Sequence, residues 1–281
     1  MKKLVLSSLL FFIIAQTFGQ DTYNYPFEVE KTGNGNQTIL FIPGFASSGD
    51  VWLETKSRYE KDFTCYTLTM EGFAGAEPSA NPSFEKWESG IANFIKEKKI
   101  RKPILVGHSM GGGLAMAIAA DYPELIEKII IVDALPCLVA LTNPNFKEGD
   151  KIDCSAVINQ ITSLPKEEFY QMQKVSILQL VQNKEKQETV LNWSISSDRQ
   201  TFAKMYCDFT NTDLREKIKN IQCPTLVLLE SNFTNFKTAI EDQYKNLKTA
   251  NLQYANKGLH FIMYDDKEWY FDQLEEFLIK D

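Results

Sequence analysis

Residues 102–120 read KPILVGHSMGGGLAMAIAA and combine three local signals within one short stretch. The first part is a short apolar run, and the last part is rich in alanine and methionine, which are strong helix formers. Between them lies the pentapeptide Gly-His-Ser-Met-Gly, in which Ser109 is the central residue. This order predicts a buried strand, a sharp turn and a helix, with Ser109 at the corner of the turn.

A serine at such a corner adopts a sparsely populated backbone conformation, which costs on the order of 1–3 kcal/mol. We expect any side chain larger than glycine at position 107 or 111 to crowd the turn. The amide of Met110 would lie at the helix N-terminus, where partial positive charge favours an oxyanion. The five-residue pattern alone is weak, because small residues recur in ordinary strand-helix turns. Flanked by a strand and a helix, it indicates a nucleophilic serine.

Residues 1–20 are typical of a secretory signal peptide. Two lysines give a basic start, residues 4–15 form an apolar run, and the segment ends in small or polar residues. The apolar run is too short to span a bilayer comfortably. We therefore expect cleavage near Gly19 or Gln20, export to the periplasm or the medium, and no stable membrane span after processing. An uncleaved anchor or a buried N-terminal helix is the alternative.

The chain is acidic, with a formal net charge of −7 that becomes −9 once the two lysines of the expected signal peptide are removed. The one basic cluster lies within residues 96–102, where a surface helix is expected to end, and cations are favoured near a helix C-terminus without any ligand. Nucleic acid and anionic membranes are therefore not expected as partners. Because the chain has only 2 histidines, no Cys or His spacing suggests a metal site, and no cofactor is expected.

Five cysteines follow the expected signal peptide, which is an odd number. Cys65 and Cys223 lie in or beside apolar runs and are expected to behave as small buried hydrophobes. Cys137 and Cys154 flank a polar stretch and are the pair that an oxidising compartment could bridge, whereas Cys207 is expected to be unpaired. The connectivity itself is not readable from the sequence.

Short apolar runs recur along the chain and alternate with stretches of helical spacing. This alternation predicts an α/β fold with a mostly parallel sheet covered by helices on both faces. The expected strands are residues 38–42, 63–70, the run before Gly107, 128–133, 223–229 and 251–255, and the expected helices are residues 83–99, 110–121 and a final helix that starts in a capping box at Asp265 and Glu268. Residues 134–220 lack a comparable strand and predict a helical insertion, which leaves residues 21–133 and 221–281 as the core.

With these residues in view, the chain resembles the α/β-hydrolase family over about residues 36–280. Residues 107–112, GHSMGG, are similar to that family's nucleophile elbow, and residues 41–45, FIPGF, look like its first oxyanion loop. The family often has His-Gly where this loop has Pro-Gly, a departure that does not remove the backbone amide of Phe45. The resemblance implies an α/β-hydrolase fold, an oxyanion hole made by the amides of Phe45 and Met110, and a cap formed by the helical insertion.

His260 stands after the last expected strand and before the final helix, where the family keeps its general base. The other histidine, His108, belongs to the elbow, so His260 is the expected base that accepts the proton of the serine hydroxyl. The family most often places its acid beyond the strand that ends at Leu229, but no Asp follows there. Some members instead take the acid from the end of the preceding strand, so the resemblance implies Asp133 as the acid, and a capping role is its structural alternative. Glu230 is the next candidate acid, and we expect it to be a loop acid that faces solvent.

The resemblance implies an exported serine hydrolase that cleaves a carboxylic ester or a similar acyl bond in a small molecule. In that mechanism Ser109 attacks the carbonyl, His260 takes and returns the proton, and Asp133 orients the imidazole. The apolar and aromatic residues of the insertion suggest a hydrophobic acyl or alcohol group. The alternative is a ligand-binding protein on the same scaffold with little turnover. The sequence indicates neither the type of acyl bond nor the oligomeric state.

Overall fold

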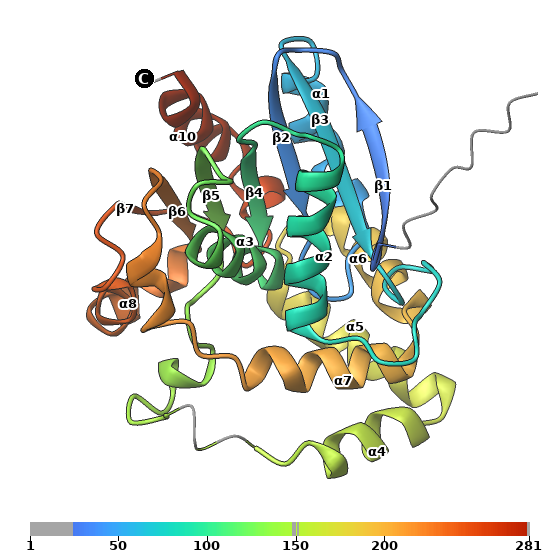
Figure 1. The fold of residues 1–281 in the computed structure, drawn as a ribbon. Coiled ribbons are helices and arrows are strands. Elements are labelled where there is room, and N and C mark those ends of the chain that lie inside the picture. The colour runs from blue at the N-terminus through green and yellow to red at the C-terminus, as the bar shows by residue number, and fades with distance from the viewer. Residues whose placement is uncertain (1–24, 148–149, 151, 280–281) are drawn as a thin grey trace, which may run out of the picture.

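The structure of the protein, a computed structural model, describes residues 25–147, 150 and 152–279. Within these residues a seven-stranded sheet carries helices on both faces, and a further group of helices lies beyond one end of the strands (Figure 1). The expected signal peptide, residues 1–20, lies outside the described residues.

The sheet is mostly parallel, which confirms the prediction. Its strands are β1 (Phe27–Thr32), β2 (Gln37–Ile42), β3 (Phe63–Met70), β4 (Ile104–His108), β5 (Lys128–Val132), β6 (Thr225–Leu229) and β7 (Ala250–Tyr254). Their spatial order is β1-β3-β2-β4-β5-β6-β7, and β1 alone runs antiparallel to its neighbour. The sequence did not predict β1, because this edge strand is largely exposed and lacks the apolar run that marks a strand buried on both faces.

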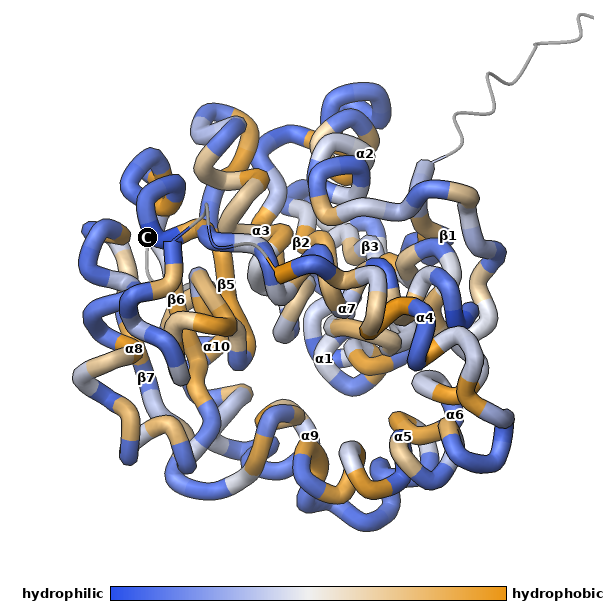
Figure 2. The backbone as a smooth tube through the Cα atoms, turned by 90° about the horizontal axis from the view of Figure 1, so that it is seen from below, coloured by the Kyte–Doolittle hydropathy of each residue, from blue (hydrophilic) through white to orange (hydrophobic). Residues whose placement is uncertain are grey.

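Alternate residues of the central strands point into two separate cores. The helices that cover the sheet are α1 (Leu53–Tyr59), α2 (Phe84–Glu97), α3 (Met110–Asp121), α8 (Lys237–Tyr244), α9 (Ile262–Asp265) and α10 (Lys267–Ile279). Leu105 and Ile129 pack with α2 and α3 on one face, whereas Val106 and Ile130 pack with α1 and α10 on the other. Figure 2 shows β5 and β6 as mostly hydrophobic and the outer turns of α2 as mostly hydrophilic.

Asp265 does not begin the final helix, so the predicted capping box is wrong. It is the last residue of α9, and α10 starts after it. Its carboxylate accepts hydrogen bonds of 2.8 to 3.1 Å from the backbone amides of Gln182, Asn183 and Leu259. Asp265 therefore ties the helical insertion to the loop that carries His260, a long-range contact that sequence spacing does not reveal.

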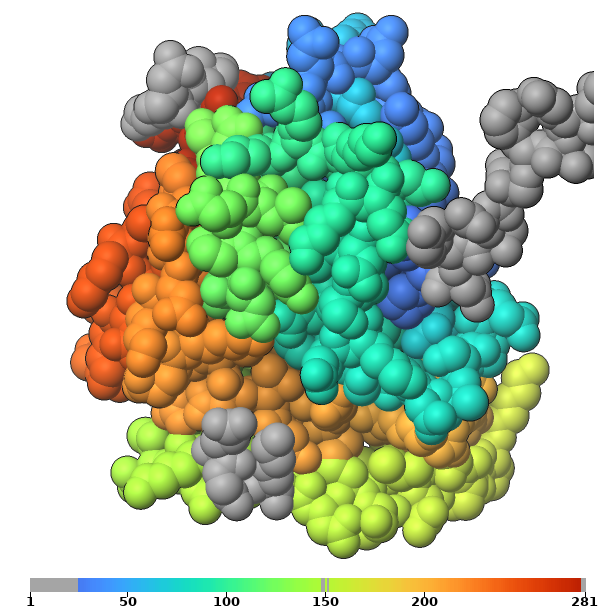
Figure 3. Space-filling view, in the orientation of Figure 1, coloured from blue at the N-terminus to red at the C-terminus, as the bar shows by residue number. Residues whose placement is uncertain are grey.

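Between β5 and β6 the chain forms mainly helices. They are α4 (Ser155–Ser163), α5 (Lys166–Leu180), α6 (Lys184–Ser196) and α7 (Arg199–Thr210), with short 3-10 turns η2 (Val139–Leu141) and η4 (Lys217–Asn220). Figure 3 shows this part of the chain as a layer along the lower side of the molecule, beyond the carboxyl ends of the parallel strands in Figure 1. We refer to residues 134–220 as the insertion.

A disulfide joins Cys154, just before α4, to Cys207 in α7. The prediction that Cys137 and Cys154 are the pair to be bridged, with Cys207 unpaired, is therefore wrong. Cys137 is buried and free, as are Cys65 and Cys223. The observed pairing depends on the packing of α4 against α7, which brings together two helices that are distant in sequence.

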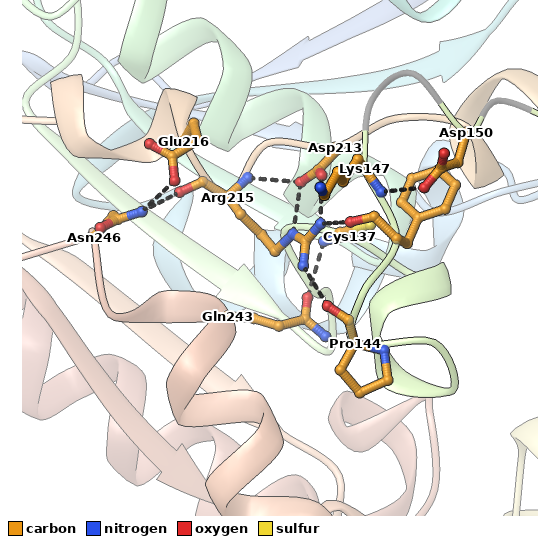
Figure 4. A network of polar contacts seen from close by, with 10 residues as sticks. Cys137, Pro144, Lys147, Asp150, Asp213, Arg215, Glu216, Gln243 and Asn246 are labelled. Atoms are coloured by element: carbon orange, nitrogen blue, oxygen red, sulfur yellow. Dashed lines mark hydrogen bonds and ion pairs between the residues drawn. The ribbon is translucent and has the colours of Figure 1, made fainter.

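Arg215 joins the first part of the insertion to its last part (Figure 4). Its guanidinium forms a bidentate ion pair with Asp213, with N–O distances of 2.9 and 2.7 Å, and also donates to the carbonyl of Phe146. Beside it, the side chain of Gln243 in α8 accepts the amide of Cys137 at 3.0 Å. Because these side chains satisfy backbone groups of an irregular loop, they fix the path of the chain from β5 into the insertion.

Candidate active site

Ser109 occupies the corner between β4 and α3 and has a left-handed backbone, with φ 52° and ψ −123°. A Cβ at Gly107 would lie 2.2 Å from the carbonyl oxygen of Gly111, and a Cβ at Gly111 would lie 2.3 Å from the carbonyl oxygen of Ile42. Both contacts are impossible for a real side chain, which confirms the predicted crowding. The turn stores strain on the order of 1–3 kcal/mol and lifts Ser109 to the wall of a cavity.

His260 and Asp133 meet at this cavity although 127 positions separate them in sequence. The Nδ1–H group of His260 donates to Oδ2 of Asp133 at 2.6 Å. The other carboxylate oxygen accepts the backbone amide of Glu230 at 2.7 Å. The Asp133 side chain is only 1% exposed, so its hydrogen bonds are shielded from water. With Nδ1 protonated, Nε2 is the ring nitrogen of His260 that can accept a proton.

Of the expected oxyanion donors, Met110 follows Ser109 directly and Phe45 lines the same cavity as Ser109. Met110 is the first residue of α3, where backbone N–H groups have no partner within the helix. Phe45 follows β2 and lines the cavity. Between β2 and Phe45, a Cβ at Gly44 would lie 2.7 Å from Nδ1 of His108 and 3.1 Å from Cβ of Ser109. Glycine at this position thus lets the loop pass directly against the serine.

His108 has a positioning role that sequence reasoning missed. It is fully buried, and its Nε2–H group donates to the backbone carbonyl of His260 at 3.0 Å. Burial, together with the neighbouring His260, lowers the pKa of His108 well below its ordinary value, so the ring is neutral. His108 therefore holds the backbone of His260 while Asp133 holds its side chain. No local sequence pattern predicts this contact, because it joins the elbow to a loop near the C-terminal end of the chain.

Glu230 does not face solvent as expected. It is half-buried, lines the cavity and follows β6 directly. Burial, with the charge of Asp133, raises the pKa of Glu230 to about 7. The contact with His260 is made by Asp133, so the structure brings Ser109, His260 and Asp133 to one cavity and leaves the Glu230 carboxyl beside them.

The cavity has a volume of about 440 Å³ and lies between the core and the insertion. Its walls are mainly apolar, and α5, α6 and α7 contribute a large part of them. The apolar lining residues are Phe45, Ala46, Ala134, Leu135, Leu138, Leu141, Ile177, Leu180, Val190, Phe209, Phe233 and Phe261. A buried polar pair interrupts this surface, in which Ser194 donates to the side-chain oxygen of Gln173 at 2.7 Å.

The described residues offer neither a cluster of metal ligands nor a membrane-spanning helix. Among residues 25–147, 150 and 152–279, no three His, Cys, Asp or Glu side chains cluster as metal ligands would. In the same part of the chain, no helix has the length and apolar character needed to cross a membrane.

Comparison with known sequences finds relatives over much of the chain. The family described as alpha/beta hydrolase fold matches residues 37–267. The dihydrolipoyllysine-residue acetyltransferase component of the acetoin cleaving system of Cupriavidus necator is 32% identical over 120 residues, 42% of this chain and 32% of that protein. A pimeloyl-[acyl-carrier protein] methyl ester esterase of Wigglesworthia glossinidia brevipalpis is 25% identical over 209 residues, 72% of this chain and 76% of that protein. The chain spans about a third of the length of the first curated relatives it matches.

Solved structures show the same architecture. An esterase from Exiguobacterium antarcticum aligns with a TM-score of 0.76 at 17% identity, covering 90% of this chain and 96% of that chain. At this level of identity the likeness concerns the fold alone. The family match, however, extends from β2 to the first residue of α10 and so includes the elbow, Asp133 and His260. The chain therefore belongs to the α/β hydrolase fold family.

Proposed function

We propose that the protein is an exported serine hydrolase that cleaves a carboxylic ester or a similar acyl bond. The observation that carries the proposal is the 2.6 Å hydrogen bond between His260 and Asp133 at the cavity that Ser109 also lines. A strained serine, an oriented imidazole and a buried carboxylate are the groups that nucleophilic acyl transfer requires.

In the proposed reaction the Ser109 hydroxyl attacks the substrate carbonyl while Nε2 of His260 accepts its proton. Asp133 stabilises the resulting imidazolium through the Nδ1 hydrogen bond. The amides of Phe45 and Met110 stabilise the negative charge that develops on the carbonyl oxygen. His260 then protonates the leaving alcohol. A water molecule, deprotonated by His260, attacks the acyl carbon, the bond to the Ser109 oxygen breaks, and His260 returns the proton to that oxygen as the acid leaves.

The mainly apolar cavity supports a small or medium hydrophobic acyl or alcohol group as the substrate. The relative from Wigglesworthia that is named as a methyl ester esterase supports an ester as the bond that is cleaved. We propose further that the insertion acts as a cap, because α5, α6 and α7 close one side of the cavity.

Export is supported by the basic and apolar pattern of residues 1–20. The Cys154–Cys207 disulfide adds support, because disulfides persist mainly in oxidising compartments. Protein recovered from the periplasm or medium of the native host should begin near Gln20 or Asp21 by intact-mass measurement. Soluble cytoplasmic protein that retains Met1 would contradict export.

The hydrolase proposal is tested by labelling the mature protein with a fluorophosphonate, because only an activated serine reacts rapidly and the natural substrate need not be known. We expect rapid labelling of the native protein and none of the Ser109→Ala variant. A folded native protein that binds hydrophobic esters but neither labels nor hydrolyses them would instead be a ligand-binding protein on the same scaffold.

A further inference from the structure

Glu230 places in the cavity a carboxyl group that the proposed catalytic steps do not use. Its backbone amide holds Asp133, while its own side chain lines the cavity. Among the described residues, no hydrogen bond or ion pair reaches the Glu230 carboxyl group. A half-buried acid without a partner is costly, because burial removes hydration that nothing replaces. This cost makes the group a candidate for contact with a ligand.

The charges that act on Glu230 come from three elements. Asp133 follows β5, Asp265 belongs to α9, and His260 lies in the loop before α9 and is hydrogen-bonded to Asp133. None of the described residues that line the cavity is a lysine or an arginine. An ionised Glu230 therefore experiences the negative charges of Asp133 and Asp265, with no lysine or arginine among the described lining residues, and the raised pKa of its carboxyl group agrees with this setting.

We propose that Glu230 selects substrates that carry an ammonium group, which pairs with its carboxylate next to the ester that is cleaved. The inference rests on the proposed hydrolase function, since it concerns the substrate of the same site. An ammonium group supplies the counter-charge that the protein lacks there, and the charges of Asp133 and Asp265 attract it as well. A substrate carboxylate would meet repulsion from the same groups.

A neutral hydrogen-bond acceptor suits this corner of the cavity less well than an ammonium group does. It would bond only to the protonated form of Glu230, and its partial negative charge would lie near the Asp133 carboxylate. An ammonium group pairs with the ionised form instead, so its binding releases the proton of Glu230. Selection for the cation should therefore strengthen as the pH rises through about 7.

Three methyl esters test this selection with matched length. Methyl 6-aminohexanoate, methyl heptanoate and monomethyl pimelate each place five methylenes between the ester and an end group that is an ammonium, a methyl or a carboxylate. Butyrylcholine and its uncharged isostere 3,3-dimethylbutyl butyrate test the alcohol side in the same way. The measurement is kcat/KM by pH-stat titration between about pH 6 and about pH 8.5, where an alkylammonium stays charged.

On at least one side of the ester, kcat/KM for the cationic ester should exceed that for its neutral partner by about tenfold or more at the highest pH. At the lowest pH this ratio should be smaller. In the Glu230→Gln variant this ratio should fall to about one and lose its pH dependence. Glu230→Asp should keep part of the preference. Glu241→Gln, which removes an exposed carboxylate on α8, is the matched control and should keep the native ratio.

Equal kcat/KM for the cationic and neutral esters on both sides, in a protein that hydrolyses methyl heptanoate, would overturn this inference and leave the hydrolase proposal unaffected. A preference that persists in Glu230→Gln would overturn it too. If that variant does not fold, the ratio of kcat/KM between cationic and neutral esters in the native protein, and its change with pH, still test the inference. Absence of any ester hydrolysis together with absence of fluorophosphonate labelling would overturn the hydrolase proposal, and this inference with it.

Discussion

Replacing Asp133 by asparagine tests the proposed acid with little change in shape. In the native protein one carboxylate oxygen accepts the Nδ1–H of His260 at 2.6 Å, and the other accepts the backbone N–H of Glu230 at 2.7 Å. Both partners are donors, and the side chain is closed off from solvent. Because asparagine has one oxygen, it can serve only one of these donors and must turn its NH2 group toward the other.

Each orientation of the asparagine has a cost that can be estimated. If its oxygen faces Glu230, its NH2 group donates to Nδ1 of His260, and the ring proton moves to Nε2, which then cannot accept the proton of Ser109. If its oxygen faces His260, two donors meet at the Glu230 amide in a buried site, which costs about 1–3 kcal/mol, or roughly fivefold to 160-fold in population. The imidazolium loses its counter-charge in both cases. We therefore expect kcat to fall by roughly 10³–10⁴.

The assay is steady-state hydrolysis of methyl heptanoate, with circular dichroism to confirm that the variant is folded. Glu230→Gln, measured on the same neutral ester, should lower kcat by less than about tenfold, since among the described residues the hydrogen bond to the His260 ring comes from Asp133 and not from Glu230. A folded Asp133→Asn variant that keeps more than a tenth of native kcat would refute the reasoning. The reverse ranking of the two variants would transfer the role of the acid to Glu230.

Three further outcomes are expected. Ser109→Ala and His260→Ala should each lower ester hydrolysis by roughly 10³-fold or more, and the double variant should be little worse than either, because the residues act as a unit. Substantial hydrolysis of a chromogenic ester by the Ser109→Ala variant would disprove the assignment of Ser109 as the nucleophile. Reduction of the Cys154–Cys207 disulfide should lower the free energy of unfolding by up to about 4 kcal/mol, given the sequence separation of 53, as urea titration with and without reductant would show. Because the pKa of Glu230 lies near 7 instead of its ordinary 4.5, the folded state binds more protons than the unfolded state between these values, and this carboxyl lowers stability as the pH rises. The Tm of Glu230→Gln should therefore rise relative to the native Tm between about pH 5 and about pH 8. A Tm difference that stays constant over this range would contradict the argument.

Features encoded in one contiguous stretch were predictable from the sequence. The strand, the turn and the helix around Ser109 each depend on neighbouring residues, so the local pattern was sufficient. The resemblance to the family predicted His260 as the base, from its place after the last strand in a chain with 2 histidines. Asp133 followed because the carboxyl ends of parallel strands meet at one edge of a sheet, which placed a residue directly after β5 near the elbow.

Features that depend on contacts between distant segments were not predictable in this way. The partner of Cys154 is set by how α4 packs on α7, and the sequence shows no preference among the cysteines. Asp265 has the spacing of a helix cap, yet three backbone amides from two other segments bind its carboxylate. Glu230 is a polar residue after a strand, which usually means a loop exposed to water, but here the insertion covers the strand ends.

Neighbouring strands fix the proposed nucleophile, Ser109, and the proposed acid, Asp133, before any substrate binds. The backbone N–H of Ser109 donates to the last carbonyl of β5 at 2.8 Å, and that of Asp133 donates to a carbonyl of β6 at 2.7 Å. The sheet ladder thus continues one residue beyond each strand, and both residues then turn with φ near +50°. Such strained conformations persist only where the surrounding structure over-determines them, and here the ladder does so. His260, which lies on an irregular loop, lacks this support and is held instead by Asp133 through its ring and by His108 through its carbonyl. The proposed base is therefore held at two points, its ring and its carbonyl, although no strand carries it.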